Sequence, residues 1–110
     1  MVRNTPFDAL GDPTRRRIFE RLLAGPQPVH RLAAGLPVSR PAVSQHLKAL
    51  QAAGLVSGRP RGRTRIYAIN PAGVSALRST VEAFWDSALE QFQAAADAAA
   101  ASGRQEEESR

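Results

Sequence analysis

Apolar residues recur at helical spacing through the first half of the chain. The clearest case is a stripe of Val43, Leu47 and Leu50, which share one side of an α-helix that advances about 100° per residue. Ser39 is a favoured N-cap residue and Gly54 is favoured just beyond a helix C-terminus. The pattern therefore predicts one helix between these two residues, over positions 40–53.

The side of this helix that faces away from the stripe carries no carboxylate. It presents Ser44, Gln45 and Lys48, with Arg40 at its start. A solvated helix usually mixes both signs of charge, because Glu and Lys pairs one turn apart stabilise it. A face of short hydrogen-bonding groups and cations instead suits a negatively charged partner that presents hydrogen-bonding edges.

Two further helices are predicted before residue 26. The first is capped by Asn4 or Thr5, and the second begins with Asp12 as N-cap and Pro13, and ends at Gly25. Phe7 and Leu10 form the apolar side of the first helix, whereas Ile18, Leu22 and Leu23 of the second face inward. A third, short helix is predicted over residues 28–34.

After Gly54 the pattern changes to strands. The segments "LVSGRP" and "RTRIYAI" flank the turn "RGR" and predict a two-stranded hairpin. An isolated hairpin is marginal in water, so this one is expected to pack on the helices. The residues predicted to make that contact are Leu55, Val56, Ile66, Tyr67 and Ile69.

A last, long helix is predicted after Asn70 and Pro71. Its apolar stripe includes Val81, Phe84, Trp85, Leu89 and Phe92. This stripe is too apolar for a helix that packs on only one side of so small a core, and aromatic residues are typical of the centre of an interface. We expect it to form a dimer interface with Phe7 and Leu10 of a second copy; packing inside the same chain is the alternative.

Length and composition limit the other possibilities. A chain of 110 residues with 43% apolar content supports a single core, predicted over residues 1–96, and residues 97–110 are expected to be a disordered tail. The chain has no cysteine, which excludes disulfides and thiolate metal sites. It shows neither a signal peptide nor an apolar run long enough for a bilayer, so we expect a cytoplasmic protein without a membrane partner.

The net charge of +5 hides an asymmetry between the two parts of the chain. Residues 1–70 hold twelve Lys and Arg against three Asp and Glu, whereas the remainder holds three against seven. A directed basic surface of this kind favours a polyanionic partner.

Helices followed by a hairpin predict a mainly α fold with a small β-hairpin, the winged helix-turn-helix, in which the hairpin is the wing. The second helix of such a pair enters the major groove of DNA, and here the pair is 28–34 and 40–53. Gln45 can pair bidentately with adenine, while the wing arginines suit phosphates or the minor groove. The predicted DNA-binding residues are Ser39, Arg40, Ser44, Gln45, His46, Lys48, Arg59, Arg61, Arg63 and Arg65.

Other classes of function find less support in the sequence. An enzyme is not expected, since the chain has two separated histidines, no cysteine and no Gly-rich phosphate loop. RNA binding is disfavoured because Tyr67 is the only aromatic residue near the basic hairpin. A protein-interaction module, or an architectural module that binds DNA without sequence specificity, remains the alternative.

Three segments, "DPTRRRIFERLLAG", "SRPAVSQHLKALQAAGLV" and "RGRTRIYAINP", together resemble the ArsR family of bacterial winged-helix repressors. The resemblance covers roughly residues 5–93. It implies a homodimer held by the first and last helices, a palindromic operator on double-stranded DNA, and repression that an inducer relieves.

The resemblance also shows where this chain departs from metal-sensing members. Their cysteine pair falls here on Pro28 and His30, a third frequent cysteine falls on Ala33, and the last helix has Asp86 but no histidine between residues 71 and 93. We therefore expect no metal at these sites and no cofactor. One hypothesis is a pocket for a small apolar effector at Phe84 and Trp85, between two copies of the last helix; the other is an autorepressor without a ligand.

Overall fold

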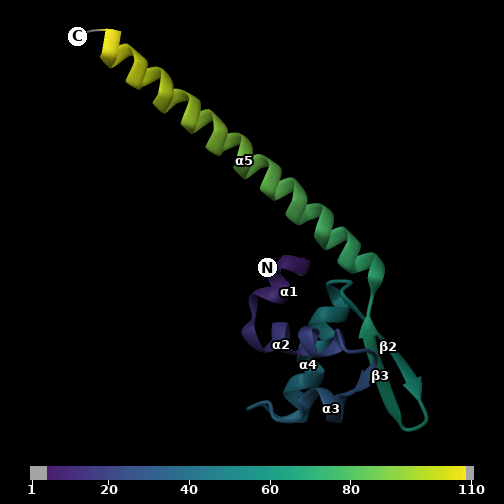
Figure 1. The fold of residues 1–110 in the computed structure, drawn as a ribbon. Helices are drawn as coiled ribbons and strands as arrows, with labels where there is room; N and C mark the ends of the chain where they lie inside the picture. The colour runs from purple at the N-terminus through teal and green to yellow at the C-terminus, as the bar shows by residue number, and fades with distance from the viewer. Residues whose placement is uncertain (1–4, 109–110) are drawn as a thin grey trace. The chain divides into compact units, whose positions relative to one another are not determined.

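The computed structural model describes residues 5–108 and contains the predicted helices and hairpin, with one short strand added (Figure 1). In chain order the elements are α1 (Pro6–Gly11), α2 (Pro13–Leu22), β1 (Gln27–Pro28), α3 (Val29–Ala33), α4 (Arg40–Ala52), β2 (Val56–Arg61), β3 (Thr64–Ile69) and α5 (Pro71–Glu108).

The chain divides into two compact units, Met1–Leu77 and Arg78–Arg110. The boundary falls within α5 and not at residue 96, and α5 stays helical to Glu108, where a disordered tail is expected from residue 97. The physical reason is composition, because residues 94–101 contain seven alanines, and alanine is the strongest helix former. Residues 109–110 of the expected tail lie outside the described residues.

The core of the N-terminal unit is apolar throughout the described residues. It consists of Ala9, Ile18, Leu22, Leu32, Val43, Leu47, Leu50, Ala53, Leu55, Val56 and Tyr67. The predicted stripe of α4 is therefore fully buried, as are Ile18 and Leu22 of α2. Leu23 is not, because it lies about 100° around the helix from Leu22 at the point where α2 ends, and 67% of it is exposed.

Helix α4 is closed at both ends by the predicted caps. The Ser39 hydroxyl accepts a hydrogen bond of 3.2 Å from a backbone N–H of the first turn. At the other end Gly54 has a φ of 79°, its N–H donates to the carbonyl of Gln51, and the N–H of Leu55 donates to the carbonyl of Leu50. This pair of bonds is a Schellman motif, which fixes where α4 ends and the hairpin begins.

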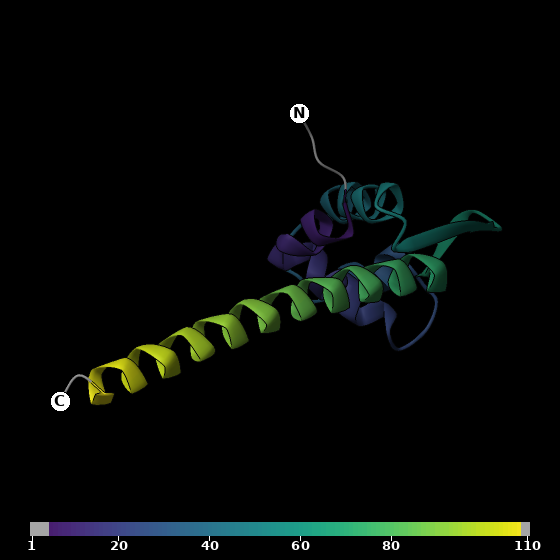
Figure 2. The same ribbon diagram turned by 90° about the horizontal axis from the view of Figure 1, so that it is seen from above.

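The sheet has three antiparallel strands in the order β1-β3-β2. Strand β1 pairs Gln27 with Tyr67 and Pro28 with Ile66, where the sequence predicts the start of a helix at Pro28. The hairpin thus packs on the helices and also joins the segment before α3 through backbone pairing. In both views the β2–β3 turn lies clear of the helices of this unit (Figures 1 and 2).

The two faces of the hairpin differ. Tyr67 is buried, and a side chain at Gly58 would lie 2.9 Å from its ring, so Gly58 lets β2 pass close to the tyrosine. Ile66 was predicted to pack on the helices as well, and that prediction is wrong. Successive residues of a strand point to opposite faces, so Ile66 lies on the face that Tyr67 leaves open.

Candidate nucleic-acid interface

The outer surface of α4 carries the polar residues that the sequence places there. Arg40, Gln45 and Lys48 are exposed, and Ser44 is half-buried. No residue of α4 is acidic. Because the opposite side of the helix is fully buried in the core, the directions of these side chains are set by packing.

Arg21 of α2 fixes the corner between α3 and α4. Its guanidinium donates to the carbonyl of Leu32 at 2.9 Å and also to the carbonyls of Arg31 and Ala34. The carbonyl of Arg31 also accepts from the backbone N–H of Ala34, whereas carbonyls at the end of a helix otherwise lack an intrahelical donor, and Arg21 supplies one from another element. The sequence gives no signal for this role, since residues 21 and 31–34 share no motif or period.

His46 connects α4 to α2. Its Nδ1 accepts a hydrogen bond of 3.4 Å from Nε of Arg15, and its side chain is half-buried. The sequence places His46 among the DNA contacts, and this geometry leaves only Nε2 for that role. Arg15 was not singled out in the sequence, because a contact across 31 positions follows no local pattern.

Asp12 lies beside this pair at the start of α2. Its carboxylate accepts hydrogen bonds from the backbone N–H groups of Thr14, at 2.9 Å, and Arg15, at 3.0 Å. The bond from Arg15 is the largest cause that lowers the pKa of Asp12, helped by the bond from Thr14 and by the positive charge of Arg15 and opposed by burial. The predicted N-cap of α2 is therefore confirmed.

The four predicted wing arginines are exposed: Arg59, Arg61, Arg63 and Arg65. Strand alternation places Arg59 and Arg61 on the face of the sheet away from α4, and Arg65 on the other face. The guanidinium of Arg65 donates to the carbonyl of Gly58 at 3.2 Å. Arg63 lies in the two-residue turn between the strands, so the four cations point in different directions from one wing.

Comparisons with known proteins bear on this arrangement. A family model for a helix-turn-helix domain matches residues 10–59. The HTH-type transcriptional regulator Rv2034 of Mycobacterium tuberculosis is 55% identical over 83 residues, which cover 76% of this chain and 78% of that protein.

Two solved structures are similar as well. The ArsR-like transcriptional regulator from Rhodococcus sp. RHA1 has a TM-score of 0.63 and 40% identity, covering 78% of this chain and 84% of that one. The homodimeric winged helix-turn-helix DNA-binding domain Mb0332 from Mycobacterium bovis, a possible ArsR-family regulator, has a TM-score of 0.59 and 29% identity, covering 73% and 74%. This chain belongs to the ArsR family.

Membership confirms the predicted family and the winged helix-turn-helix fold. An ArsR-family chain is a DNA-binding transcriptional regulator, and the family is not one of enzymes. Within the described residues, no helix is both long and apolar enough to cross a membrane.

The positions where metal-sensing ArsR members carry cysteine extend from the N-cap to the last residue of α3. Pro28 is the N-cap residue of that helix, His30 is exposed, and Ala33 is its last residue. Among residues 5–108 the structure brings together no group of three or more His, Asp or Glu side chains that could hold a metal ion.

The aromatic stripe of α5 is open to solvent in the single chain. Phe84, Trp85, Leu89 and Phe92 are 70%, 60%, 57% and 72% exposed, and Val81 is half-buried. A surface hollow beside the stripe is lined by Glu82, Trp85, Asp86 and Leu89, so it includes Trp85 but not Phe84 of the predicted effector pocket. On α1, Phe7 is 49% exposed, while Leu10 packs against the core.

Proposed function

We propose that this ArsR-family chain is a homodimeric repressor that binds a palindromic operator through α4 and the wing. The observation that carries the proposal is the outer face of α4, which exposes Arg40, Gln45 and Lys48 and no acid. A carboxylate on that face would meet DNA phosphates, so its absence is what a groove-binding helix requires.

The proposed contacts divide into two kinds. Gln45 and Ser44 are placed to read base edges in the major groove, whereas Lys48 and Arg40 suit guanine or phosphate. Ser39 already caps α4 through its hydroxyl, and His46 bonds Arg15, so both hold the helix in position and are secondary candidates for contact. The wing arginines supply salt-dependent attraction to the backbone or the minor groove.

The stripe of α5 supports the dimer. Four large apolar side chains that are more than half exposed form an unusual surface for a single chain, and association would remove them from water. The similar domain from Mycobacterium bovis is homodimeric. A two-fold axis would space two recognition helices about 34 Å apart, one turn of DNA, which implies a palindromic site.

The signal to which the repressor responds differs from that of the metal sensors. His30 is a single ligand at a site where three or four would be needed, so the proposal includes no metal response at the family positions. Regulation is then by a small apolar effector at Phe84 and Trp85 of paired α5 helices, or by autorepression without a ligand. Trp85 is the only tryptophan of the chain, so its fluorescence reports directly on this choice.

The test is fluorescence anisotropy against DNA from the gene's own promoter and against scrambled DNA, at two salt concentrations. We expect at least about thousandfold preference for the promoter. Gln45→Ala should weaken promoter binding by about 1–3 kcal/mol and leave scrambled DNA unchanged. Gln91→Ala, the same change at an exposed position of α5, is the matched control. Equal, salt-sensitive binding to both DNAs would contradict the proposal and favour an architectural module.

A further inference from the structure

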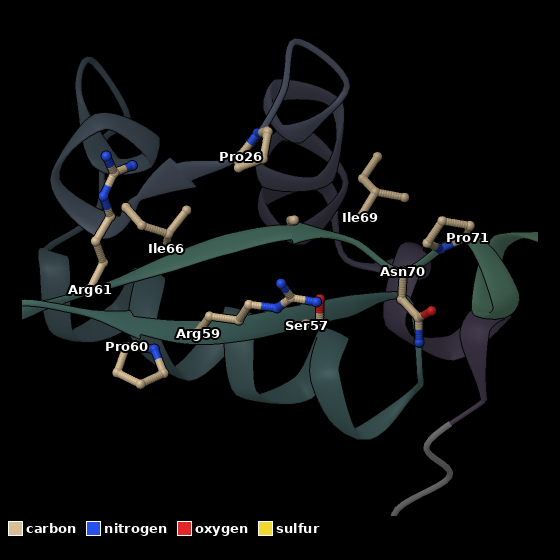
Figure 3. Close-up of a pocket in the computed structure, with 10 residues that line it drawn as sticks. Pro26, Ser57, Arg59, Pro60, Arg61, Ile66, Ile69, Asn70 and Pro71 are labelled. Carbon is tan, nitrogen blue, oxygen red and sulfur yellow. The ribbon is translucent and has the colours of Figure 1, made fainter.

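The outer face of the sheet, away from α4, carries a groove that the proposed DNA contacts do not explain. Its volume is about 710 Å³, within the range of small-molecule sites (Figure 3). It is lined by Pro26, Ser57, Arg59, Pro60, Arg61, Ile66, Ala68, Ile69, Asn70 and Pro71. All of these residues belong to the N-terminal unit.

The register of the hairpin explains why the groove has an apolar floor. Ser57 pairs with Ala68 and Arg59 pairs with Ile66, so these four side chains lie on one face of the sheet. Ile66 and Ala68 are only half-buried there, and neither belongs to the packed core. The floor is therefore an apolar surface outside the packed core.

The charges around the floor are all positive. Arg59 extends along β2 toward Ser57, and Arg61 rises on the side of the sheet where Ile66 and Pro26 lie (Figure 3). No lining residue is acidic, and neither arginine forms an ion pair among the described residues. A neighbouring hollow shares Pro26, Arg61 and Ile66 and adds His30 and Arg31, so positive charge gathers around Arg61, toward the turn.

We propose that this groove binds a small amphipathic carboxylate, with its head on Arg59 and Arg61 and its apolar tail over Ile66 and Ala68. The two arginines are separated by about 7 Å along the strand and can both donate to one carboxylate, which forms strong charge-assisted hydrogen bonds with guanidinium groups. Burial of the tail covers the floor that the fold leaves open. A neutral apolar molecule or a small anion matches only one half of the groove.

The site has a regulatory consequence that rests on the proposed function. Arg59 and Arg61 are also candidate phosphate contacts, so an occupied groove engages two of the four wing cations and cancels one unit of their positive charge. Carboxylate and DNA then compete, and the ligand weakens operator binding.

The test uses octanoate as the probe and the full chain without DNA, followed by shifts of backbone amide signals in NMR. We expect saturable shifts at Ser57, Ile66 and Ala68, with weaker binding of both acetate and 1-octanol. Arg59→Gln with Arg61→Gln should weaken octanoate binding at least tenfold. The matched control is Arg63→Gln with Arg65→Gln, which removes the same charge from the same wing outside the groove and should change the affinity less than twofold.

The outcomes separate the site from its alternatives. Equal loss in the two double variants would overturn the proposal in favour of general attraction to the wing, and acetate binding as tight as octanoate would reduce the site to an anion site. Octanol binding as tight as octanoate would remove the role of the arginines. Octanoate should also lower promoter affinity, and a lack of competition would refute the regulatory step alone. Failure of the protein to select its promoter would refute the proposed function and leave the octanoate result intact.

Discussion

Truncation of Leu89 tests whether the stripe of α5 is an interface. Leu→Ala removes about three carbons, or about 2.4 kcal/mol on full burial. Because 57% of Leu89 is exposed in the single chain, association could remove at most that share from water, which leaves about 1.4 kcal/mol per copy. A symmetric dimer carries the change twice, so Leu89→Ala should cost about 2.8 kcal/mol and raise the dimer dissociation constant about 100-fold.

The assay is sedimentation equilibrium over a range of protein concentrations. Leu23→Ala is the matched control, because Leu23, the C-cap residue of α2, is exposed to a similar degree but lies outside the stripe. It should leave the dissociation constant unchanged. A shift below about threefold for Leu89→Ala, or an equal shift for Leu23→Ala, would refute the assignment of the interface to α5.

Three further predictions concern the fold, each followed by urea unfolding. A methyl group at position 73 would lie 1.7 Å from the carbonyl oxygen of Gly54, so Gly73→Ala should destabilise the folded protein by about 3 kcal/mol or more. A methyl group at position 103 would meet no atom within 4 Å, so Gly103→Ala should stabilise it by up to about 1 kcal/mol. Ser39→Ala removes the N-cap of α4 and should lower the stability by about 1 kcal/mol. Ser39→Thr keeps a hydroxyl at this position and should preserve most of that stability. Asp12→Asn should lower the free energy of unfolding at neutral pH. The difference from the unmodified protein should vanish as pH falls through the lowered pKa of Asp12, because the protonated carboxyl is then uncharged, as the amide is. A difference that persists in acid would contradict this prediction.

Signals in short stretches of the sequence are sufficient to predict most of the fold. The cap residues, the Gly54 stop and the apolar period each depend on residues within one or two turns, so α2, α4 and the hairpin follow from the sequence. Strand β1 does not, because two residues are too few for a period and their pairing partners lie 38 to 40 positions away. The length of α5 was underestimated for a different reason, since alanine carries high helix propensity but little hydrophobic pattern.

The candidate site divides in the same way. The exposed residues of α4 and the wing arginines are visible in the sequence, because one helical face or one turn holds them. The supports are not visible, since Arg21 bonds carbonyls ten or more positions away and Arg15 bonds His46 across 31. The groove of the sheet is not visible in the sequence, because only the register reveals which face Ile66 occupies.

The distribution of acids completes the case for a DNA-facing N-terminal unit. Residues 71–77 carry no charge, so the change in charge along the chain coincides with the boundary between the units. Only three acids lie before that boundary, and two of them act at helix starts: Asp12 caps α2, while Asp8 lies in the first turn of α1 and accepts from Thr5. Two of the three acids in this unit therefore lie at helix N-termini, where negative charge is favourable, and the surface carried by α4 and the wing is free of acids. Selection for solubility alone would not keep acids away from one surface of the protein. A surface that must approach phosphates requires their absence.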